Sequence, residues 1–381
     1  MKKKALIVAN LIGFVGFLWN DIDVLEELGY EVSFAANADV ITGENHQETL
    51  CNRGIKFYQL DFSSKNPLAK ENLRAYSTIR NLVKREKYDV IHCHTPIAGF
   101  ITRIAARKVR KSGTKIIYTT HGLSFTHLSS KKQWMGYYFF EKFASLFTDV
   151  IITINHEDFV NAKTMCCKDV RIINGVGVDT NKYHNVNINV ENYKQLIGIP
   201  KGKIIVLSVG ELSARKNHQI IIKAIGLIPN KEDYCYVICG REVVGSGVAE
   251  MLESLAQERG VNLMLLGHRN DIPEIMHCSD IGAIPSIREG LGLAGIQSLC
   301  AGVPLVGTDV QGIKDYILPG QTGFLCNPYD ELEYRDAIVK LSDPQLRRSM
   351  EESCYRMAKQ FDVEISHKQM REIYISILNG K

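Results

Sequence analysis

The chain has 381 residues, of which 45% are hydrophobic and 23% charged, and its formal net charge at pH 7 is +4. This length suggests two domains, and this composition is that of a globular enzyme, which excludes a disordered or fibrous protein. No apolar run reaches the roughly 18–20 residues of a membrane-spanning helix. The apolar N-terminus reads as a buried strand and not as a signal peptide, because no small-residue cleavage site follows it.

Short apolar runs alternate with amphipathic segments along the chain. The first series of predicted strands comprises residues 4–10, 31–36, 55–60, 88–94, 114–120, 149–154 and 170–175. The second series comprises residues 203–210, 234–240, 261–267, 280–286, 303–308 and 323–327. Near-continuous apolar strands that alternate with helices predict parallel sheets covered on both faces, and therefore an α/β fold with two doubly wound, Rossmann-like domains.

The polar, Gly- and Asn-rich stretch 175–202 interrupts this alternation and is predicted to be a linker. We expect residues 1–178 to form the first domain and residues 179–362 the second, with a C-terminal helix, 363–381, returning to the first. In open α/β sheets, ligands bind beyond the carboxyl ends of the strands. The predicted site is accordingly a cleft between two facing domains, and the residues just after each strand are its candidates.

In the first domain, Gly13 and Gly16 follow the first strand and would permit close backbone approach to a ligand, although such loops are often only tight turns. His121 ends the fifth strand, where an imidazole can bind a sugar hydroxyl or face the reacting atoms. His92 and His94 are expected to be structural rather than functional. They suggest no metal site, because no third ligand has a recognisable spacing.

In the second domain, Arg215 and Lys216 lie between a strand end and a helix start, which is a favourable place for a diphosphate. Arg269 also follows a strand, in a segment that could contact a base edge or serve as a plain turn and helix cap.

Glu289 opens the turn Glu-Gly-Leu-Gly, in which Gly290, Leu291 and Gly292 are expected to supply the turn and the first helical N–H groups for phosphate oxygens. Gln297 comes eight residues after Glu289. In a continuous helix these positions would share a face and lie about 12 Å apart, which could bridge from a sugar ring to a ribose.

Charge is unevenly distributed: residues 1–178 carry 24 Lys and Arg against 17 Asp and Glu, whereas the remainder carries 22 against 25. A basic half suggests an acidic partner such as phosphate, lipid headgroups or nucleic acid. Arg103, Arg107 and Arg110 are predicted on one helical face, and the aromatic, Lys-containing stretch 131–147 could lie on an anionic membrane. The aromatic residues of that stretch could equally be core.

Ten cysteines without a CxxC pair favour buried free thiols in a reducing cytoplasm over disulfides or a metal site. The pair Asp21 and Asp23 imitates a metal-binding DxD motif, but it falls in a predicted helix and not after a strand. Residues 245–250 fail the dinucleotide fingerprint at its sixth position.

Taken together, these residues make the chain resemble a family 4 retaining glycosyltransferase of the GT-B fold, most like the EpsD-like enzymes of capsule and exopolysaccharide synthesis. The resemblance covers nearly the whole chain. It is carried by the motifs HCHTPIAG (92–99), T-x-H-G (119–122), TDVIITIN (148–155), GVGVDTNKY (175–183), SVGEL (208–212), KNH (216–218), ICG (238–240), G-x-R-x-DIP (267–273), PSIREGL (285–291) and AGVPLVGTDVQG (301–312). The family's E-x7-E motif begins at Glu289 but ends at Gln297. The usual Pro is Gly292, and Glu211 replaces a basic residue after the strand-end glycine.

The resemblance implies that Glu289 contacts the hydroxyls of the donor sugar, and that Lys216, with Arg215, binds the diphosphate. It also implies that residue 297 holds the ribose and that His121 lies near the anomeric centre. The implied reaction transfers an N-acetylhexosamine or related hexose from a UDP-sugar to a polyprenyl-diphosphate-linked saccharide. No metal or other cofactor is expected.

The expected partners are the nucleotide sugar, the lipid-linked acceptor and an anionic membrane surface at the inner face of the cell membrane, with no nucleic acid. Two other functions stay open. A nucleotide-sugar epimerase of the same fold would release a free isomerised sugar nucleotide, and a non-catalytic UDP-sugar-binding protein would release no UDP.

Overall fold

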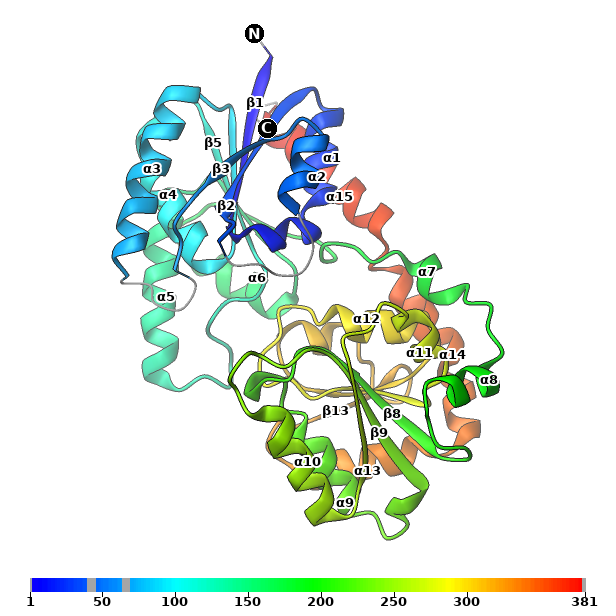
Figure 1. Cartoon of the computed structure of the whole chain (residues 1–381). Helices are drawn as coiled ribbons and strands as arrows, with labels where there is room; N and C mark the ends of the chain where they lie inside the picture. Colours follow the sequence, from blue (N-terminus) through cyan, green and yellow to red (C-terminus); the bar gives the residue numbers. More distant parts are fainter. Residues whose placement is uncertain (1, 40–45, 64–68, 379–381) are drawn as a thin grey trace. The chain divides into compact units, whose positions relative to one another are not determined.

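The computed structural model describes residues 2–39, 46–63 and 69–378. The chain divides into two compact units (Figure 1): unit 1 comprises Met1–Gly177 and Val363–Lys381, and unit 2 comprises Val178–Asp362. All thirteen predicted strands are present. They form two separate parallel sheets, which confirms the predicted fold of two Rossmann-like domains.

Unit 1 contains a seven-stranded sheet with the strand order β3-β2-β1-β4-β5-β6-β7. Its strands are β1 (Lys3–Leu11), β2 (Tyr30–Asn37), β3 (Lys56–Gln59), β4 (Val90–His94), β5 (Lys115–Thr120), β6 (Val150–Thr153) and β7 (Asp169–Ile172). Its helices are η1 (Ile12–Phe17), α1 (Trp19–Glu27), α2 (His46–Asn52), α3 (Lys70–Glu86), α4 (Pro96–Arg110), α5 (Lys131–Ser145), α6 (His156–Lys163) and α15 (Val363–Leu378). On one face α1 packs against α15, and on the other α4 packs between α3 and α5 (Figure 1).

Unit 2 contains a six-stranded sheet with the strand order β10-β9-β8-β11-β12-β13. Its strands are β8 (Ile204–Val209), β9 (Tyr234–Cys239), β10 (Asn262–Gly267), β11 (Ile281–Ile284), β12 (Leu305–Thr308) and β13 (Gly323–Cys326). Its helices are α7 (Thr180–His184), α8 (Val190–Leu196), η2 (Ala214–Lys216), α9 (Gln219–Gly226), η3 (Lys231–Asp233), α10 (Val248–Arg259), α11 (Ile272–His277), α12 (Leu293–Cys300), η4 (Gln311–Asp315), α13 (Glu331–Leu341) and α14 (Pro344–Lys359). Helix α9 packs against α10 and α13, whereas α12 packs against α7 and α14.

The C-terminal helix α15 belongs to unit 1. A Cβ atom at Gly177 would lie 2.6 Å from the Val363 Cα, so only glycine fits where the chain leaves and re-enters this unit. Asn20 donates to the Ser366 hydroxyl at 3.2 Å, and Ser366 donates to the Gly175 carbonyl at 2.8 Å. These contacts fix α15 beside α1. Residues 379–381 of the predicted helix lie outside the described residues.

The prediction of a linker over residues 175–202 was wrong. This stretch contains α7 and α8, and from Val178 onward it belongs to unit 2. Its scattered apolar residues Ile188, Tyr193 and Ile197 pack against the core formed by β8, β9 and α11. Their spacing is too irregular to stand out from the polar background, which explains the error.

The expectation that Arg103 shares a membrane-facing helical face with Arg107 and Arg110 was wrong. The Arg103 side chain is fully buried: its Nη2 donates to Glu141 Oε2 at 2.6 Å, and its guanidinium lies 3.9 Å from the Tyr118 ring centroid. Arg110 donates to Asp149 Oδ1 at 3.0 Å. Helical spacing does place these arginines on one side, but Arg103 and Arg110 pair there with acids on other elements, and Arg107 donates to the Tyr76 hydroxyl at 3.0 Å.

Candidate functional site

The candidate donor site of unit 2 is built on two neighbouring strands, β8 and β11. Because these parallel strands pair directly, the loops after their carboxyl ends meet. Arg215 and Lys216 form part of η2 after β8, and Glu289 follows β11. The Ile287 amide donates to the Arg215 carbonyl at 3.0 Å and joins the two loops.

Glu289 binds both cations through a single oxygen. Its Oε2 accepts from Lys216 Nζ at 2.8 Å and from Arg215 Nη1 at 3.0 Å. Arg215 also donates to Glu211 Oε1 at 3.0 Å. Burial raises the pKa of Glu289, but the attraction of Lys216 and Arg215 outweighs burial and holds this pKa below its usual range. The carboxylate is therefore ionised at neutral pH, and the predicted sugar-binding and diphosphate-binding groups are in direct contact.

Two strand-end glycines lie beneath this cluster. A Cβ atom at Gly210 would lie 3.1 Å from the Lys216 Cε, and one at Gly240 would lie 1.7 Å from the Gly210 carbonyl oxygen. Glycine at these positions lets the Lys216 side chain lie directly against the backbone that ends β8. The ammonium is then held beside Glu289.

The segment Glu289–Gly292 is a turn, and the expectation that it supplies the first helical residues was wrong. Helix α12 begins at Leu293, and Gly292 is its N-cap with φ +76°. The left-handed conformation of Gly292 ends the turn, and the Tyr316 hydroxyl donates to the Gly292 carbonyl at 3.1 Å. A Cβ atom at Gly295 would lie 2.4 Å from the Tyr316 hydroxyl oxygen. Tyr316 therefore shapes this turn.

Backbone packing also supports the turn from the other side. A Cβ atom at Gly312 would lie 2.3 Å from the Gly290 carbonyl oxygen and 2.6 Å from the Leu291 Cα. Sequence reasoning missed both Tyr316 and Gly312 as supports of the site. The only signal was the sequence Val-Gln-Gly at 310–312, which gives no hint of what it contacts.

Gln297 lies on α12, one turn after its first residue, and its side chain is partly exposed. No hydrogen bond of its amide occurs within the part of the chain that the structure describes. Because the helix does not extend back to Glu289, the 12 Å spacing expected for a continuous helix does not apply. The amide keeps its full capacity to donate to and accept from a ligand.

Arg269 is not brought to the Glu289 cluster. It follows β10 at the edge of the sheet, with β9 between β10 and β8. Its Nε donates to Asp271 Oδ1 at 2.8 Å, and the Tyr193 hydroxyl also donates to Asp271. Asp271 is the N-cap residue of α11, but its side chain makes no capping hydrogen bond to that helix and instead accepts from Arg269 and Tyr193. Contact of Arg269 with a base edge stays a prediction.

In unit 1, His121 directly follows β5 and contacts the loop after β1. The ring of Phe14, which lies between Gly13 and Gly16 in η1, meets the His121 ring edge-on with 4.8 Å between centroids. The Gly13 and Gly16 loop therefore lies beside His121, as their common strand-end positions suggested. Burial lowers the pKa of His121 to about 4, so the ring is neutral at pH 7.

The contact with the neighbouring His94 allows the proton of His121 to be assigned. His94 Nδ1 lies 3.1 Å from His121 Nε2, whereas the buried His94 Nε2 has no partner among the described residues. A buried N–H group without an acceptor is rarer than an unpaired acceptor. This hydrogen-bond pattern therefore places the His94 proton on Nδ1, and His121 accepts it at Nε2. The His121 proton then lies on Nδ1, which makes this nitrogen a hydrogen-bond donor.

His92 is structural. It is fully buried, and its two nitrogens lie 2.7 Å from the Tyr374 and Thr119 hydroxyls. The Tyr374 hydroxyl, on the returning helix α15, donates to Asp21 Oδ1 at 3.1 Å. Burial raises the pKa of Asp21 to about 7, and the hydrogen bond from Tyr374 only partly offsets it. The predicted helix for Asp21 and Asp23 is present as α1.

The raised pKa of Asp21 makes folding stability depend on pH. The folded state keeps the proton that the unfolded chain loses near pH 4, so this carboxyl destabilises the fold progressively from about pH 4 to 7. Asp21→Asn, which still accepts from Tyr374, should raise the melting temperature at pH 8, and the gain should shrink steadily toward pH 5. A gain of equal size at pH 5 and pH 8 would contradict the assignment.

Three general findings concern the described residues. Across residues 2–39, 46–63 and 69–378, no helix is both long and apolar enough to cross a membrane. Within the same ranges, no three His, Cys, Asp or Glu side chains gather closely enough to hold a metal ion. All ten cysteines are free thiols, and eight of them are buried.

Both units match known protein families. Residues 189–359 match the family model described as glycosyl transferases group 1, and residues 22–155 match the one described as glycosyl transferase 4-like. The chain is a glycosyltransferase enzyme, and it belongs to the family 4 type with the GT-B fold.

Two curated relatives are similar over most of the chain. It is 29% identical over 390 residues to the putative glycosyltransferase EpsD of Bacillus subtilis (strain 168), covering 100% of this chain and 98% of that one. It is 26% identical over 331 residues to the UDP-Gal:alpha-D-GlcNAc-diphosphoundecaprenol alpha-1,3-galactosyltransferase of Escherichia coli, covering 82% and 81%. Among solved structures, Anabaena HepE in complex with UDP shares the fold with a TM-score of 0.78 at 20% identity, covering 98% of this chain and 100% of that one.

Proposed function

We propose that the protein is a retaining glycosyltransferase that moves a hexose or N-acetylhexosamine from a UDP-sugar to a polyprenyl-diphosphate-linked saccharide during capsule or exopolysaccharide synthesis. The observation that carries this proposal is the contact of Lys216 and Arg215 with Glu289 at the ends of β8 and β11. It occurs in a chain that aligns over its whole length with a putative glycosyltransferase, EpsD of Bacillus subtilis.

The cluster contains the two positive charges that a sugar diphosphate requires. Lys216 and Arg215 carry two positive charges, and Glu289 and Glu211 carry two negative ones, so the group is neutral before the donor binds. A diphosphate would draw the two cations toward its oxygens. The carboxylate of Glu289 would then be available to accept hydrogen bonds from sugar hydroxyls.

Transfer breaks the bond between the anomeric carbon and the diphosphate oxygen. The transition state should resemble an oxocarbenium ion, with negative charge developing on the leaving diphosphate. Lys216 and Arg215, once drawn to the diphosphate oxygens, would stabilise that charge. We propose that these cations supply the charge neutralisation that a metal ion supplies in other enzymes, so that no metal is needed.

His121, in unit 1, is proposed as a neutral hydrogen-bond donor through Nδ1. A ring that is already neutral at pH 7 suits binding to a sugar hydroxyl or to the reacting region better than it suits charge stabilisation. Because no residue among those that the structure describes stands out as an enzyme nucleophile, we propose that the acceptor attacks from the face that the diphosphate leaves. Its hydroxyl oxygen bonds to the anomeric carbon, and its proton passes to the departing diphosphate oxygen.

The acceptor class rests on similarity. The Escherichia coli relative is named for transfer to GlcNAc-diphosphoundecaprenol, and we propose a lipid-linked acceptor of the same chemical class here. The test is a panel of UDP-sugars incubated with membrane extract and scored by release of UDP. We expect one donor to release UDP only when the extract is present. A free epimerised sugar nucleotide would instead support an epimerase, and binding without turnover would support a sensor.

Gln297 offers a prediction on donor binding. If its amide binds the ribose, Gln297→Ala should raise the donor KM with little change in kcat, whereas Gln297→Glu should keep or improve donor affinity. Gln297 has no partner within the described residues, so truncation should leave the melting temperature unchanged. An unchanged KM for Gln297→Ala would count against the ribose role, and a lowered melting temperature would indicate a structural role instead.

We also propose that the protein lies on the inner face of the cell membrane, with α5 as its membrane surface. Aromatic side chains are exposed along this helix, among them Phe139 at 59% and Phe143 at 50%. These two side chains are therefore not part of the core, which was the other alternative for this stretch. Phe139→Ser with Phe143→Ser should weaken binding to anionic vesicles severalfold in a co-sedimentation assay, and added salt should weaken binding of the wild type by screening its lysines. Unchanged sedimentation of the double variant would exclude α5 as the membrane surface.

A further inference from the structure

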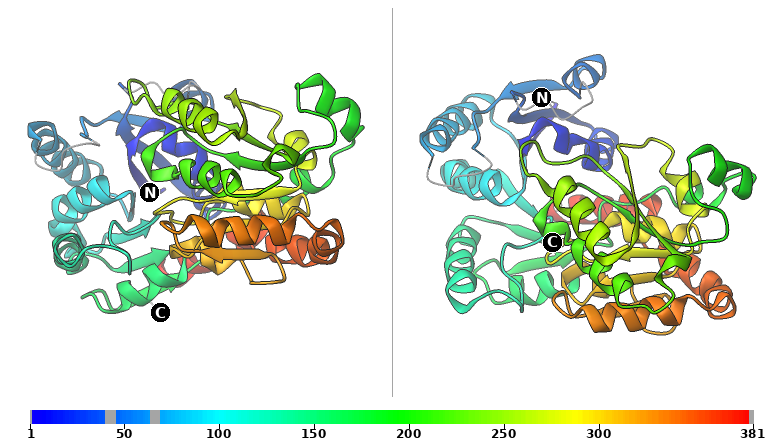
Figure 2. Two further views of the ribbon diagram at one scale, coloured as in Figure 1. Left: turned by 90° about the horizontal axis from the view of Figure 1, so that it is seen from below. Right: turned by 60° about the horizontal axis from the view of Figure 1, so that its bottom comes forward.

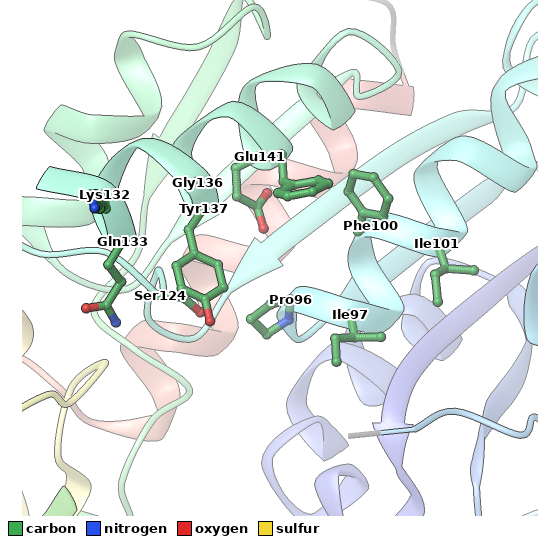
Figure 3. A pocket seen from close by; sticks show the side chains of 11 residues that line it. Pro96, Ile97, Phe100, Ile101, Ser124, Lys132, Gln133, Gly136, Tyr137 and Glu141 are labelled. Carbon is green, nitrogen blue, oxygen red and sulfur yellow. The ribbon is translucent and has the colours of Figure 1, made fainter. Parts of the chain in front are cut away.

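A pocket of about 430 Å³ lies between α4 and α5 in unit 1, outside the residues assigned to sugar transfer (Figure 3). Its volume is within the range of pockets that bind small molecules. The pocket is lined by Pro96, Ile97, Phe100, Ile101, Ser124, Lys132, Gln133, Gly136, Tyr137, Phe140 and Glu141.

The walls of the pocket are mainly apolar. Figure 3 shows the Tyr137 ring of α5 directed toward Pro96, with Ile97 and Phe100 following along α4. Phe100 and Phe140 meet edge-on with 5.7 Å between ring centroids. The one carboxylate in the lining belongs to Glu141, and the buried Arg103 neutralises it. The interior therefore favours an uncharged, apolar ligand.

One end of the pocket is polar and basic. Lys132 and Gln133 lie together at the N-terminal end of α5, beyond the Tyr137 ring (Figure 3). Both side chains are exposed, as is that of Lys131. In the right-hand view of Figure 2, α5 stands at the outer side of unit 1. A ligand can therefore reach the pocket from solvent or from a membrane surface.

The pocket is close to the His121 loop along the chain. Pro96 begins α4 two residues after His94, at the end of β4, and Ser124 comes three residues after His121, at the end of β5. The lining thus begins at the sheet edge where His94 and His121 lie 3.1 Å apart. A ligand bound there would have one end near that edge.

We propose that this pocket binds the first prenyl units of the lipid-linked acceptor, with the diphosphate that joins lipid to saccharide near Lys132. This inference rests on the proposed function and names a binding site for its acceptor. A prenyl diphosphate has an apolar chain attached to a strongly anionic group, which matches an apolar pocket with Lys132 at one end. A neutral lipid or an uncharged helix of another protein would need the apolar walls but not this positive charge.

Gly136 allows the pocket to be filled without harming the fold. A Cβ atom at this position meets nothing within 4 Å, and its φ lies outside the left-handed region, so a larger side chain would project into open pocket space. Replacing glycine with alanine inside a helix also favours folding. Gly136→Leu should therefore fold as well as the wild type while blocking the ligand, and Gly136→Ala is the matched control.

Binding can be followed without any transfer reaction. The chain has two tryptophans, and Trp134 lies on α5, stacked on Tyr138 with 4.6 Å between ring centroids. In a Trp19→Phe background, titration with farnesyl diphosphate should change the Trp134 fluorescence in a saturable way. Gly136→Leu should weaken this binding at least tenfold, and Gly136→Ala should change it less than threefold. Lys132→Gln should weaken binding of farnesyl diphosphate but not of farnesol, and Lys142→Gln, which lies outside the pocket, should weaken neither.

Binding to a bilayer and binding in the pocket can be distinguished with two variants, the double phenylalanine variant and Gly136→Leu. Phe139→Ser with Phe143→Ser alters exposed residues that do not line the pocket, so it should leave farnesyl diphosphate binding intact. Absence of saturable binding, or equal binding by wild type and Gly136→Leu, would overturn the proposal. So would a loss of binding in Gly136→Leu that is equally large for anionic vesicles without prenyl lipid.

Failure of this proposal differs from failure of the proposed function. If farnesyl diphosphate binds as described but no UDP-sugar is consumed, the transfer reaction is wrong and the pocket assignment stands. If Gly136→Leu transfers sugar to the lipid-linked acceptor with the wild-type acceptor KM, the pocket assignment is wrong, whereas the proposed transfer reaction remains valid.

Discussion

Lys216→Ala is expected to lower kcat/KM for the UDP-sugar by about ten- to a hundredfold, which corresponds to about 1.5–3 kcal/mol for a charge-assisted hydrogen bond. The ammonium lies 2.8 Å from Glu289, with Gly210 beneath its side chain, so it is already in place before the donor binds. Alanine removes one of the two charges that would face the diphosphate. Arg215 still pairs with Glu289, so the buried carboxylate is not left alone and the variant should fold.

The measurement is steady-state kinetics of UDP release against donor concentration, with the melting temperature recorded for each variant. Lys201→Ala, which changes an exposed lysine outside the cluster, is the matched control and should keep the wild-type kcat/KM. A folded Lys216→Ala variant with unchanged kcat/KM would remove Lys216 from the diphosphate site.

Glu289→Gln should lower kcat by about a hundredfold, the size of effect seen when one electrostatic contact to a transition state is removed. The amide keeps the shape of the side chain but cannot balance Lys216 and Arg215, so the cations lose their fixed positions. Its contact with the sugar hydroxyls would also become weaker and uncharged. Because the loss falls mainly on the transition state, donor KM should change little.

Glu211→Gln provides the matched control for this variant. Glu211 also accepts from Arg215, but its side chain is 45% exposed against 17% for Glu289. Its ion pair should therefore contribute little, and kcat should fall less than threefold. If Glu289→Gln raised donor KM and left kcat intact, Glu289 would be a binding residue with no part in the transition state.

The sequence was sufficient to predict the strands and the strand-end positions of the site residues. Continuous apolar runs in a parallel sheet are a local signal, and all thirteen appear in the fold. That Glu289 directly binds Lys216 was not predictable in the same way. It depends on β11 lying beside β8, which is a matter of strand order and not of local sequence.

The errors arose where burial depends on distant residues. Helical spacing correctly placed Arg103 and Arg110 on one side of α4, but their partners Glu141 and Asp149 come 38 and 39 residues later. The start of α12 was misplaced because the left-handed Gly292 is supported by Tyr316, 24 residues further on. Such long-range contacts cannot be predicted from the local pattern of apolar and polar residues.

The central claim is that the protein transfers sugar from a UDP-sugar to a lipid-linked acceptor. It is tested most directly by incubating the purified protein with a UDP-sugar labelled in its sugar and a synthetic prenyl-diphosphate-linked saccharide, and by measuring both UDP and label extracted into organic solvent. We predict equal molar amounts of UDP and lipid-linked label, and a ten- to hundredfold lower rate for Lys216→Ala. If, with every UDP-sugar tried, label stayed in the aqueous phase while the acceptor was present, the claim would be contradicted.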